Sequence, residues 1–558
     1  MRLVTQLLSS PLFRKRRCIE STPAAITRAD GQLWDRLALI LIAVLAGLVA
    51  LTFQDYGITT DEYVQQIYGE KLWAFYLSGF TDRSAFHFDN LYLYGGLFDM
   101  AAVALQHVLP FEPYDTRHLL CGLVGVLGVI GTWQLARLVG GARVGFVAAL
   151  LLALTASWYG AMFNNTKDIP FAVGMFWALY LICRIADKLP RPPMHIVIWF
   201  GVALGATLAV RVGALFAVFY LALALAVRAA EVGSRSGWQA ALHEAASAAL
   251  RLLPALVVAF AVMAVFWPWS VLSPANPLRA VAQLSGFAIP TLLDGRIYVN
   301  DLPAAYLPVY LAIKLPELTL LGFAAGTVVL LRALRRWNGE AGKLCLLAVA
   351  IALPLLYLFA FDPHLYNGIR HFFFVVPPIC VLAALGLDRA IGWAHRRSPL
   401  LGLAAAAVLV VLSGREALTM RELHPHQYIY YNALVGGPGG AYRRFELDYW
   451  SNFLPQAVDE LAAYLRAENK GKAPTRRYSV TICTNKQVLK AYAPPFLVPA
   501  PVWEQADFFI STTNTDCDKA LAGRVIIEVA REGAVLGVVK DRRPGTTALG
   551  TSQQPQIR

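Results

Sequence analysis

The chain has 558 residues, of which 57% are hydrophobic and only 15% are charged. A composition this apolar is typical of a protein that crosses the membrane many times, and it excludes a single large soluble core. The net charge of +13 would suggest a nucleic-acid partner in a soluble protein, but here short basic loops between apolar segments account for most of it. We therefore expect membrane lipids, and no nucleic acid, among its partners.

The N-terminal residues 1–34 are polar and basic and include Arg14-Lys15-Arg16-Arg17. They have no leading apolar core, so no cleavable signal peptide is expected. The first apolar segment, Leu37–Phe53, is long enough to cross a bilayer as a helix and is preceded by Arg28 and Arg36. Basic residues beside a span stay in the cytoplasm, which predicts a cytoplasmic N-terminus.

Directly after this span, Thr59-Thr60-Asp61-Glu62 opens an amphipathic stretch from Tyr63 to Leu77. Thr59 and Glu62 have the spacing of a capping box, and Asp61 would favour the positive end of a helix. The alternative is catalytic, with Asp61 held as a carboxylate at the outer membrane surface. The local sequence leaves both interpretations open.

One later apolar segment, Leu91–Leu109, differs from the others because it contains Gly95, Gly96 and Asp99. If it does not cross, every predicted cytoplasmic loop is basic and the outer loops carry only isolated cations. If it does cross, this pattern is inverted. We therefore predict a re-entrant or juxtamembrane helix here and about 11 transmembrane helices in all. The ten spans after the first are predicted at 119–138, 144–159, 169–185, 196–210, 212–227, 252–269, 318–331, 344–361, 372–387 and 400–413.

Beyond the last span the chain becomes rich in charged and turn residues, which predicts a small α/β domain on the outer side. A helix is expected at 454–467 and strands at 478–484, 507–512, 524–529 and 534–540. The predicted protein is thus an α-helical polytopic membrane protein in three parts: a cytoplasmic tail at 1–34, a membrane domain at 35–414 and an extracytoplasmic α/β domain at 415–558.

Two of the seven cysteines, Cys483 and Cys517, belong to this last domain, and each follows a predicted strand. In an oxidising compartment they are expected to form a disulfide, the alternative being two unpaired thiols. The other cysteines lie in the tail or the spans and lack the spacing of metal ligands.

Ionisable residues gather in the predicted outer loops, where such residues are functional candidates. Taken singly, several have structural explanations: Asp168 with Pro170 suits a helix start, and Arg211 could reach the interface from a span. Together they offer carboxylates and cations to a lipid phosphate and a sugar hydroxyl. The candidates are Asp61, Glu62, His87, Lys167, Asp168, Arg211, Arg296, Lys314 and Arg370.

Several of these loops resemble the GT-C superfamily, in particular the dolichyl-phosphate-mannose–protein mannosyltransferases and the lipid A aminoarabinose transferases. The resemblance covers roughly residues 35–455. The usual proline-rich element of the first loop is replaced by Phe88-Asp89-Asn90-Leu91-Tyr92, which leaves the acceptor open. The matching segments are Asp61-Glu62, Lys167-Asp168-Ile169-Pro170-Phe171, Tyr306-Leu307-Pro308, Lys314-Leu315-Pro316 and His426–Asn432 with Gly436-Gly437.

The resemblance implies transfer of a sugar, with inversion, from a polyprenyl-phosphate donor to a hydroxyl of a protein, lipid or glycan acceptor at the outer face of the inner membrane. Asp61 would be the general base, and Glu62 would orient it or bind the acceptor. Asp168 would bind the acceptor or, in some members, a divalent metal, and the need for a metal cofactor stays open. Candidates to bind the donor phosphate are Arg211, Arg296, Lys314 and Arg370, while Lys167 and His87 are further candidates for substrate binding.

Two other classes of function remain open at this stage. A transporter or flippase of lipid-linked sugars would also place polar residues between spans, but the charged residues cluster at one membrane face and no internal repeat is found. A non-catalytic scaffold that displays the C-terminal domain would not need ordered carboxylates.

Overall fold

The computed structural model describes residues 24–284, 286, 289–299, 301–336, 341–361 and 363–544, with side chains from residue 31 onward. Most of the predicted basic tail lies outside these residues. Its last part is already helical, because the first helix, α2, runs over Ala24–Thr52 and so begins before the predicted span.

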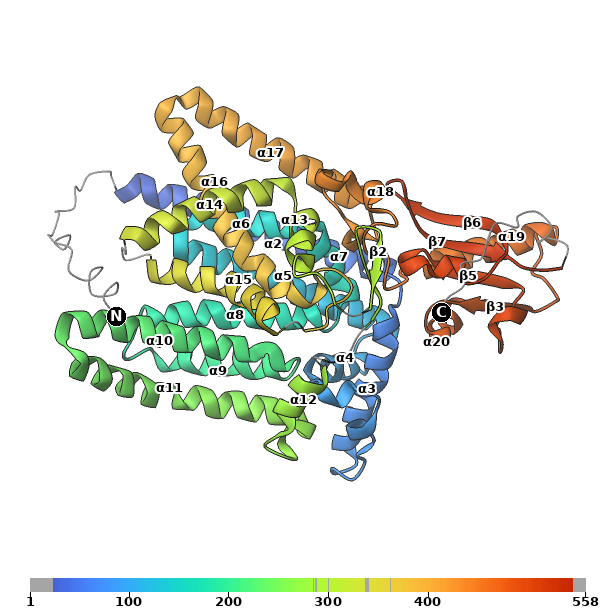
Figure 1. The fold of residues 1–558 in the computed structure, drawn as a ribbon, viewed down its shortest axis with the longest axis horizontal. Coiled ribbons are helices and arrows are strands. Elements are labelled where there is room, and N and C mark those ends of the chain that lie inside the picture. The colour runs from blue at the N-terminus through green and yellow to red at the C-terminus, as the bar shows by residue number, and fades with distance from the viewer. Residues whose placement is uncertain are drawn as a thin grey trace.

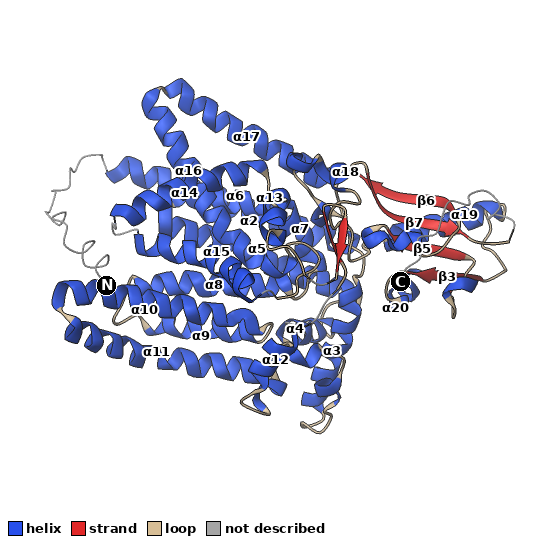
Figure 2. Ribbon diagram, in the orientation of Figure 1, coloured by secondary structure: helices blue, strands red, loops and turns tan. Residues whose placement is uncertain are grey.

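The predicted membrane domain is a bundle of helices (Figures 1 and 2). All eleven predicted spans are helical, and among the described residues nine helices are long and apolar enough to cross a membrane. The structure thus confirms the polytopic fold, with nine or ten spans by this criterion. The nine are α2, α5 (Pro113–Gly140), α8 (Asp168–Ala186), α10 (Leu215–Ser236), α11 (Trp238–Phe266), α14 (Glu317–Arg336), α15 (Ala341–Phe361), α16 (Val376–Arg397) and α17 (Pro399–Glu422).

The two remaining predicted spans differ from straight, full-length helices. The span predicted at 144–159 is a bent pair, α6 (Ala142–Ala153) and α7 (Ala156–Asn164), with an angle of 63° between its halves. The other, α9 (Met194–Leu208), has 15 residues, about 22 Å of helix, which is shorter than the roughly 30 Å hydrocarbon core.

The ambiguous segment at 91–109 contains only a 3-10 turn, η3 (Leu91–Leu93), and the ten-residue helix α4 (Leu97–Gln106). A helix of that length extends about 15 Å, half of what crossing requires. The structure therefore agrees with the prediction that this segment does not cross. Helix α4 packs on α3 (Thr60–Leu77) and α5 at one end of the bundle.

The C-terminal domain follows α17, which extends to Glu422, so the predicted domain boundary at 414 falls inside this helix. The domain has a five-stranded mixed sheet with the strand order β4-β3-β5-β7-β6. Strand β3 lies parallel to both β4 and β5, while β7 is antiparallel to β5 and β6. Its elements are α19 (Leu454–Glu468), β3 (Tyr478–Ile482), α20 (Lys486–Tyr492), β4 (Leu497–Pro499), β5 (Phe508–Thr512), β6 (Arg524–Arg531) and β7 (Ala534–Asp541).

Figure 1 shows the C-terminal domain at one end of the bundle, next to α3 and the hairpin strand β2 (Arg296–Tyr298), whereas the α10–α11 and α16–α17 turns lie at the other end. The buried Glu446 side chain helps to join the domain to the bundle. Its Oε1 accepts hydrogen bonds from Thr291 Oγ1 (2.7 Å) and the Leu292 N–H (2.6 Å), and its Oε2 accepts one from Asn514 Nδ2 (2.6 Å). One carboxylate therefore joins the segment Thr291–Leu293 of the membrane domain to the loop after β5.

Candidate functional site

Helix α3 begins with the capping box that the sequence predicted. Thr59 Oγ1 accepts a hydrogen bond from the Glu62 N–H (3.3 Å), and Glu62 Oε2 accepts one from the Thr59 N–H (2.9 Å). The Glu62 side chain is fully buried and also lies 3.2 Å from Nε2 of His118. Glu62 is thus engaged in the start of the helix and faces the protein interior.

Asp61, by contrast, keeps 40% of its side chain exposed. Arg370 lies just before α16 and donates from Nη2 to Oδ2 of Asp61 at 2.7 Å. The Nε of Arg370 donates to Oδ2 of Asp168, at the start of α8, at 3.0 Å. One guanidinium therefore joins two carboxylates that are far apart in the chain.

Asp168 lies behind this contact and is only 2% exposed. Its Oδ1 forms an ion pair with Arg211, which follows α9. Asn165 holds Asp168 from the same loop: its Nδ2 donates to Oδ2 of Asp168 at 2.6 Å, and its Oδ1 accepts from the Asp168 N–H at 2.9 Å. Both carboxylate oxygens of Asp168 are therefore used by protein groups.

Lys167 extends over the ring of Tyr94, with Nζ 4.1 Å from the ring centre, and Arg211 lies 5.5 Å from the centre of the same ring. Burial lowers the pKa of Lys167 to about 8, although the charge of Asp99 partly opposes this shift. This lysine is thus a cation whose charge changes near physiological pH, beside the guanidinium groups of Arg211 and Arg370.

The ionised form of Asp61 is favoured at this site. Burial works against that form, but the charge and hydrogen bond of Arg370 and the charge of Lys167 outweigh it and lower the pKa of Asp61. Three cations, Lys167, Arg211 and Arg370, face two carboxylates, Asp61 and Asp168. The cluster therefore has one net positive charge, which suits an anionic ligand.

A cavity of about 400 Å³ lies between this cluster and the C-terminal domain. Its membrane-domain wall includes Asp61, Lys167, Arg211 and Arg370. The opposite wall includes Cys483 and Cys517, whose sulfur atoms are bonded to each other, as the sequence predicted. The remaining lining residues include Gln65, Asn90, Leu91, Tyr94, Tyr366, Tyr449, Trp450 and Ser451.

Five candidates from the sequence lie outside the cavity lining, and one of them, Asp168, is the buried residue behind it described above. Glu62 is buried in the capping box, and His87 and Arg296 are exposed elsewhere. Lys314 is buried, donates to the Tyr428 carbonyl oxygen at 3.0 Å and lies 3.7 Å from the centre of the Tyr431 ring. Lys314 thus supports the chain that leads into the C-terminal domain.

Sequence reasoning missed the aromatic side of the site. The guanidinium carbon of Arg370 lies 5.4 Å from the centre of the Trp450 ring and 5.6 Å from that of Tyr366. Stacking of this kind restrains a guanidinium without neutralising it. The available signal was the number of aromatic residues in the connection after the last span, Tyr449-Trp450 among them.

Sequence reasoning also missed a second group of polar residues, which lies in the protein interior and contacts the cavity-lining residue Gln65. Arg117 is fully buried in α5 and donates from Nη2 to Asp99 Oδ1 of α4 at 2.6 Å. The same nitrogen donates to Gln65 Oε1 at 3.2 Å and to Thr166 Oγ1 at 3.1 Å. Since Gln65 lines the cavity and Thr166 precedes Lys167, this arginine connects α3, α4 and the loop before α8.

Within the described part of the chain, no group of three or more His, Cys, Asp or Glu side chains is arranged to hold a metal ion. The oxygens of Asp168, the residue for which a metal was considered, are already paired with guanidinium and amide groups. The chemistry that these residues offer is thus a carboxylate base beside an anion-binding group of cations.

Residues 116–271 match the family model of the dolichyl-phosphate-mannose-protein mannosyltransferases. This match confirms the relationship to membrane glycosyltransferases that the loops predicted. The matched range contains Arg117, Lys167, Asp168 and Arg211, but not Asp61 or Arg370. No curated protein matches the chain by sequence.

Solved structures with similar folds include two of ArnT from Cupriavidus metallidurans. The apo form is 15% identical, with 90% of this chain and 97% of that chain covered and a TM-score of 0.48. The form bound to undecaprenyl phosphate is 15% identical, with 92% and 99% covered and a TM-score of 0.48. The oligosaccharyltransferase AglB from Archaeoglobus fulgidus is 13% identical, with 85% and 69% covered and a TM-score of 0.47.

Proposed function

We propose that this protein, a membrane glycosyltransferase of the GT-C class, transfers a sugar from a polyprenyl-phosphate donor to an acceptor hydroxyl at the outer face of the membrane. The observation that carries the proposal is the chain of contacts from Asp61 through Arg370 and Asp168 to Arg211, beside a cavity at one end of the bundle. A transporter would instead place such groups near mid-depth.

In this proposal the donor phosphate binds at Lys167 and Arg211, with Arg370 close by. The acceptor hydroxyl approaches Asp61, which removes its proton as the hydroxyl oxygen bonds to the sugar carbon. The bond from that carbon to the phosphate oxygen breaks, and its electron pair leaves with the polyprenyl phosphate. Because negative charge grows on the leaving oxygen, cations already in place stabilise the transition state more than the ground state.

The buried Asp168 has a positioning role in this scheme. It holds the guanidinium groups of Arg211 and Arg370 from behind while remaining ionised itself. Loss of its charge would remove one carboxylate partner from both arginines at once, so Asp168 contributes to the site without contacting the substrate.

We further propose that the cavity faces the periplasm or cell exterior, with the N-terminus in the cytoplasm of an inner-membrane protein. Two observations support this orientation: the basic loops predicted on the other side, and the disulfide in the cavity wall, since such bonds persist in oxidising compartments. A lipid-linked donor fits a site at the end of a membrane bundle. The acceptor of the proposed transfer is a protein, lipid or glycan.

The test is transfer by purified full-length protein in detergent. Radiolabelled polyprenyl-phosphate hexoses and pentoses are supplied one at a time with a detergent extract of cell envelopes as acceptor. We expect one donor to label a product, and Asp61→Asn to lower the rate by a factor of roughly 100 to 10,000 without unfolding the protein. Asn is a good residue at a helix start, so the helix should survive the change.

Glu112→Gln serves as the matched control, because Glu112 is an exposed carboxylate in the same predicted outer region. It should retain wild-type transfer. Failure of the wild-type protein to transfer any of the sugars would overturn the proposed reaction. Near-normal transfer by a folded Asp61→Asn protein would leave Asp61 with a role in the helix start only.

A further inference from the structure

In the sheet of the C-terminal domain, the connections that leave the neighbouring parallel strands β3 and β5 run to opposite sides of the sheet. The chain leaves β3 through α20 to β4 on one side of β3, and then returns to β5 on the other side. In open α/β sheets, the crevice beyond the carboxyl ends of two such strands is where ligands bind. Here that crevice lies between the ends of β3 and β5.

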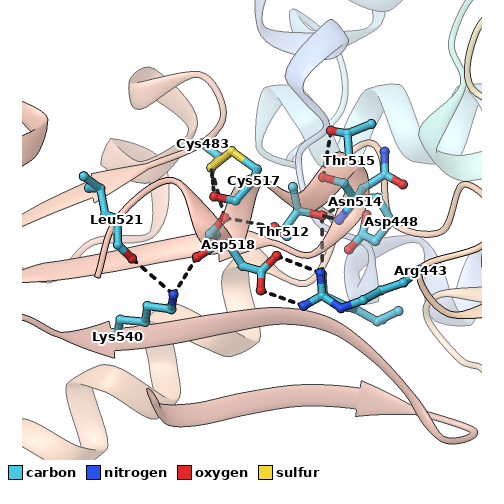
Figure 3. The surroundings of a disulfide bond; sticks show 12 residues. Arg443, Asp448, Cys483, Thr512, Asn514, Thr515, Cys517, Asp518, Leu521 and Lys540 are labelled. Atoms are coloured by element: carbon cyan, nitrogen blue, oxygen red, sulfur yellow. Dashed lines mark hydrogen bonds and ion pairs between the residues drawn. A yellow bond between two sulfur atoms is a disulfide. The ribbon is translucent and has the colours of Figure 1, made fainter. Parts of the chain in front are cut away.

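The segments at this crevice are the ones that line the cavity opposite Asp61. Cys483 and Thr484 directly follow β3, whereas Thr515 and Cys517 lie in the loop after β5. The disulfide joins the two segments across the crevice (Figure 3). The membrane domain and the sheet thus share one cavity.

Hydrogen bonds from Arg443 and Lys540 hold the loop after β5 in place, as Figure 3 shows. Arg443 donates from Nη2 to Asp518 Oδ2 at 2.7 Å, and Lys540 Nζ donates to the carbonyl oxygens of Asp518 (2.5 Å) and Leu521 (3.1 Å). Within this loop, Thr515 has a φ of 50° and Asp516 a φ of 60°. Left-handed backbone at residues other than glycine is costly and is concentrated at ligand-binding segments.

The crevice side of the cavity also differs chemically from the membrane side. Its residues Cys483, Thr484, Thr512, Thr515 and Cys517 are all uncharged. Beside them, the hydroxyl of Ser451 is buried and has no hydrogen-bond partner among the described residues, and Ser451 also has a left-handed backbone, with a φ of 60°. This wall suits a neutral ligand rich in hydroxyl groups, and not a phosphate.

From this arrangement we infer that the crevice between β3 and β5 binds the acceptor, and that the bound part of the acceptor is an uncharged, hydroxyl-rich group such as a sugar. The inference rests on the proposed function. In a displacement with inversion the attacking oxygen and the leaving phosphate lie on opposite sides of the transferred sugar. With the phosphate at Lys167 and Arg211, the body of the acceptor extends from Asp61 towards the C-terminal domain.

A binding test that does not depend on catalysis uses photocrosslinking. A benzophenone amino acid is placed at Thr484 of the full-length protein, which is irradiated with the detergent extract of cell envelopes and digested for mass spectrometry. We expect adducts that release sugar fragments. The same substitution at Thr475, an exposed residue of the same domain before β3, should give none. Absence of sugar-bearing adducts at Thr484, or equal amounts at both positions, would overturn the inference.

A kinetic test separates the acceptor from the donor. Thr484→Trp fills the crevice, so the amount of envelope extract that gives half-maximal transfer should rise about tenfold, as expected from losing one or two hydrogen bonds. The half-saturating donor concentration should not change, and Thr475→Trp should behave like wild type. A rise in the half-saturating donor concentration alone would assign the crevice to the donor sugar and overturn the inference. If the wild-type protein transfers no sugar, the proposed reaction fails while the crosslinking result still decides the inference.

Discussion

Lys167 is the residue through which the site should respond to pH. Its pKa of about 8 reflects burial against Tyr94, and it shares the cavity with Arg211, Arg370 and Asp61. Asp61 is already ionised at neutral pH, because the charge and hydrogen bond of Arg370 lower its pKa in spite of burial. Between pH 7 and 9, the lysine is therefore the group at this wall whose charge changes.

We predict that affinity for polyprenyl phosphate falls as the pH rises from 7 to 9. Lys167 is protonated below its pKa and loses its charge above it, whereas a phosphate monoester, with a second pKa of about 6, already carries most of its second negative charge at pH 7. The decline should begin near pH 8, the pKa of the lysine in the free protein, and because bound phosphate raises that pKa, the affinity should fall about tenfold. Thermal-shift titration of the purified protein measures it.

Two variants act as controls for this prediction. Lys167→Met should bind more weakly, with affinity independent of pH, and Lys167→Arg should bind well at both pH values because arginine keeps its charge. A Lys167→Met protein with the wild-type pH profile would show that another group titrates.

At the scale of elements, the pair Asp99–Arg117 explains why α4 stays at the end of the bundle. Both side chains are buried, and their contact of 2.6 Å joins α4 to the start of α5. A charged residue at the centre of the bilayer is costly, whereas near the mouth of the bundle Asp99 finds a buried partner. The apolar segment 91–109, which has the length of a span, therefore forms only the short helix α4 at the end of the bundle.

We predict that Arg117→Met lowers the free energy of unfolding by about 3–5 kcal/mol, because it leaves Asp99 as an uncompensated buried charge. The double variant Asp99→Leu/Arg117→Met should recover part of the loss. The matched control is Arg137→Met, which breaks an ion pair whose arginine is 49% exposed and should cost less than about 1 kcal/mol. Unfolding of the detergent-solubilised proteins by heat or denaturant gives these differences. Equal losses for Arg117→Met and Arg137→Met would contradict a special role for the buried pair.

At the scale of the whole molecule, contacts within the bundle determine how often the chain passes from one end to the other. Helix α9 is short for a span, yet Arg211 directly after it reaches Asp168 at the start of α8. The chain therefore returns along α9 to the end at which α8 began. Among the described residues, the nine long helices, the bent pair α6–α7 and the short α9 then make eleven passages between the two ends.

An odd number of passages predicts that the C-terminal domain and the N-terminus lie on opposite sides of the membrane. A reporter that is active only in the cytoplasm should therefore be inactive when fused after Glu422, at the end of α17. The same reporter fused after Arg397, in the turn before α17, should be active. Activity after Glu422 would invert the proposed orientation and place the cavity in the cytoplasm.

The sequence by itself determined the features that depend on local pattern. Apolar segments specify helices through their length and composition, the Thr59–Glu62 spacing predicts the capping box, and short runs rich in β-branched and aromatic residues predict most strands of the C-terminal domain. The charge pattern also predicted correctly that the segment at 91–109 does not cross. Each of these depends on residues close together in the chain, so it can be predicted without knowing how the helices pack.

Only the tertiary structure decided which candidates meet. Arg211 and Arg370 join Asp61 and Asp168, while Arg296 and Lys314, equally basic in the sequence, do not line the cavity. Glu62 differs from its neighbour Asp61 because the helix start turns one carboxylate inward and leaves the other at the cavity. The wall formed by the C-terminal domain was also unpredictable, because a cavity between elements hundreds of residues apart arises from their packing, which no local pattern encodes.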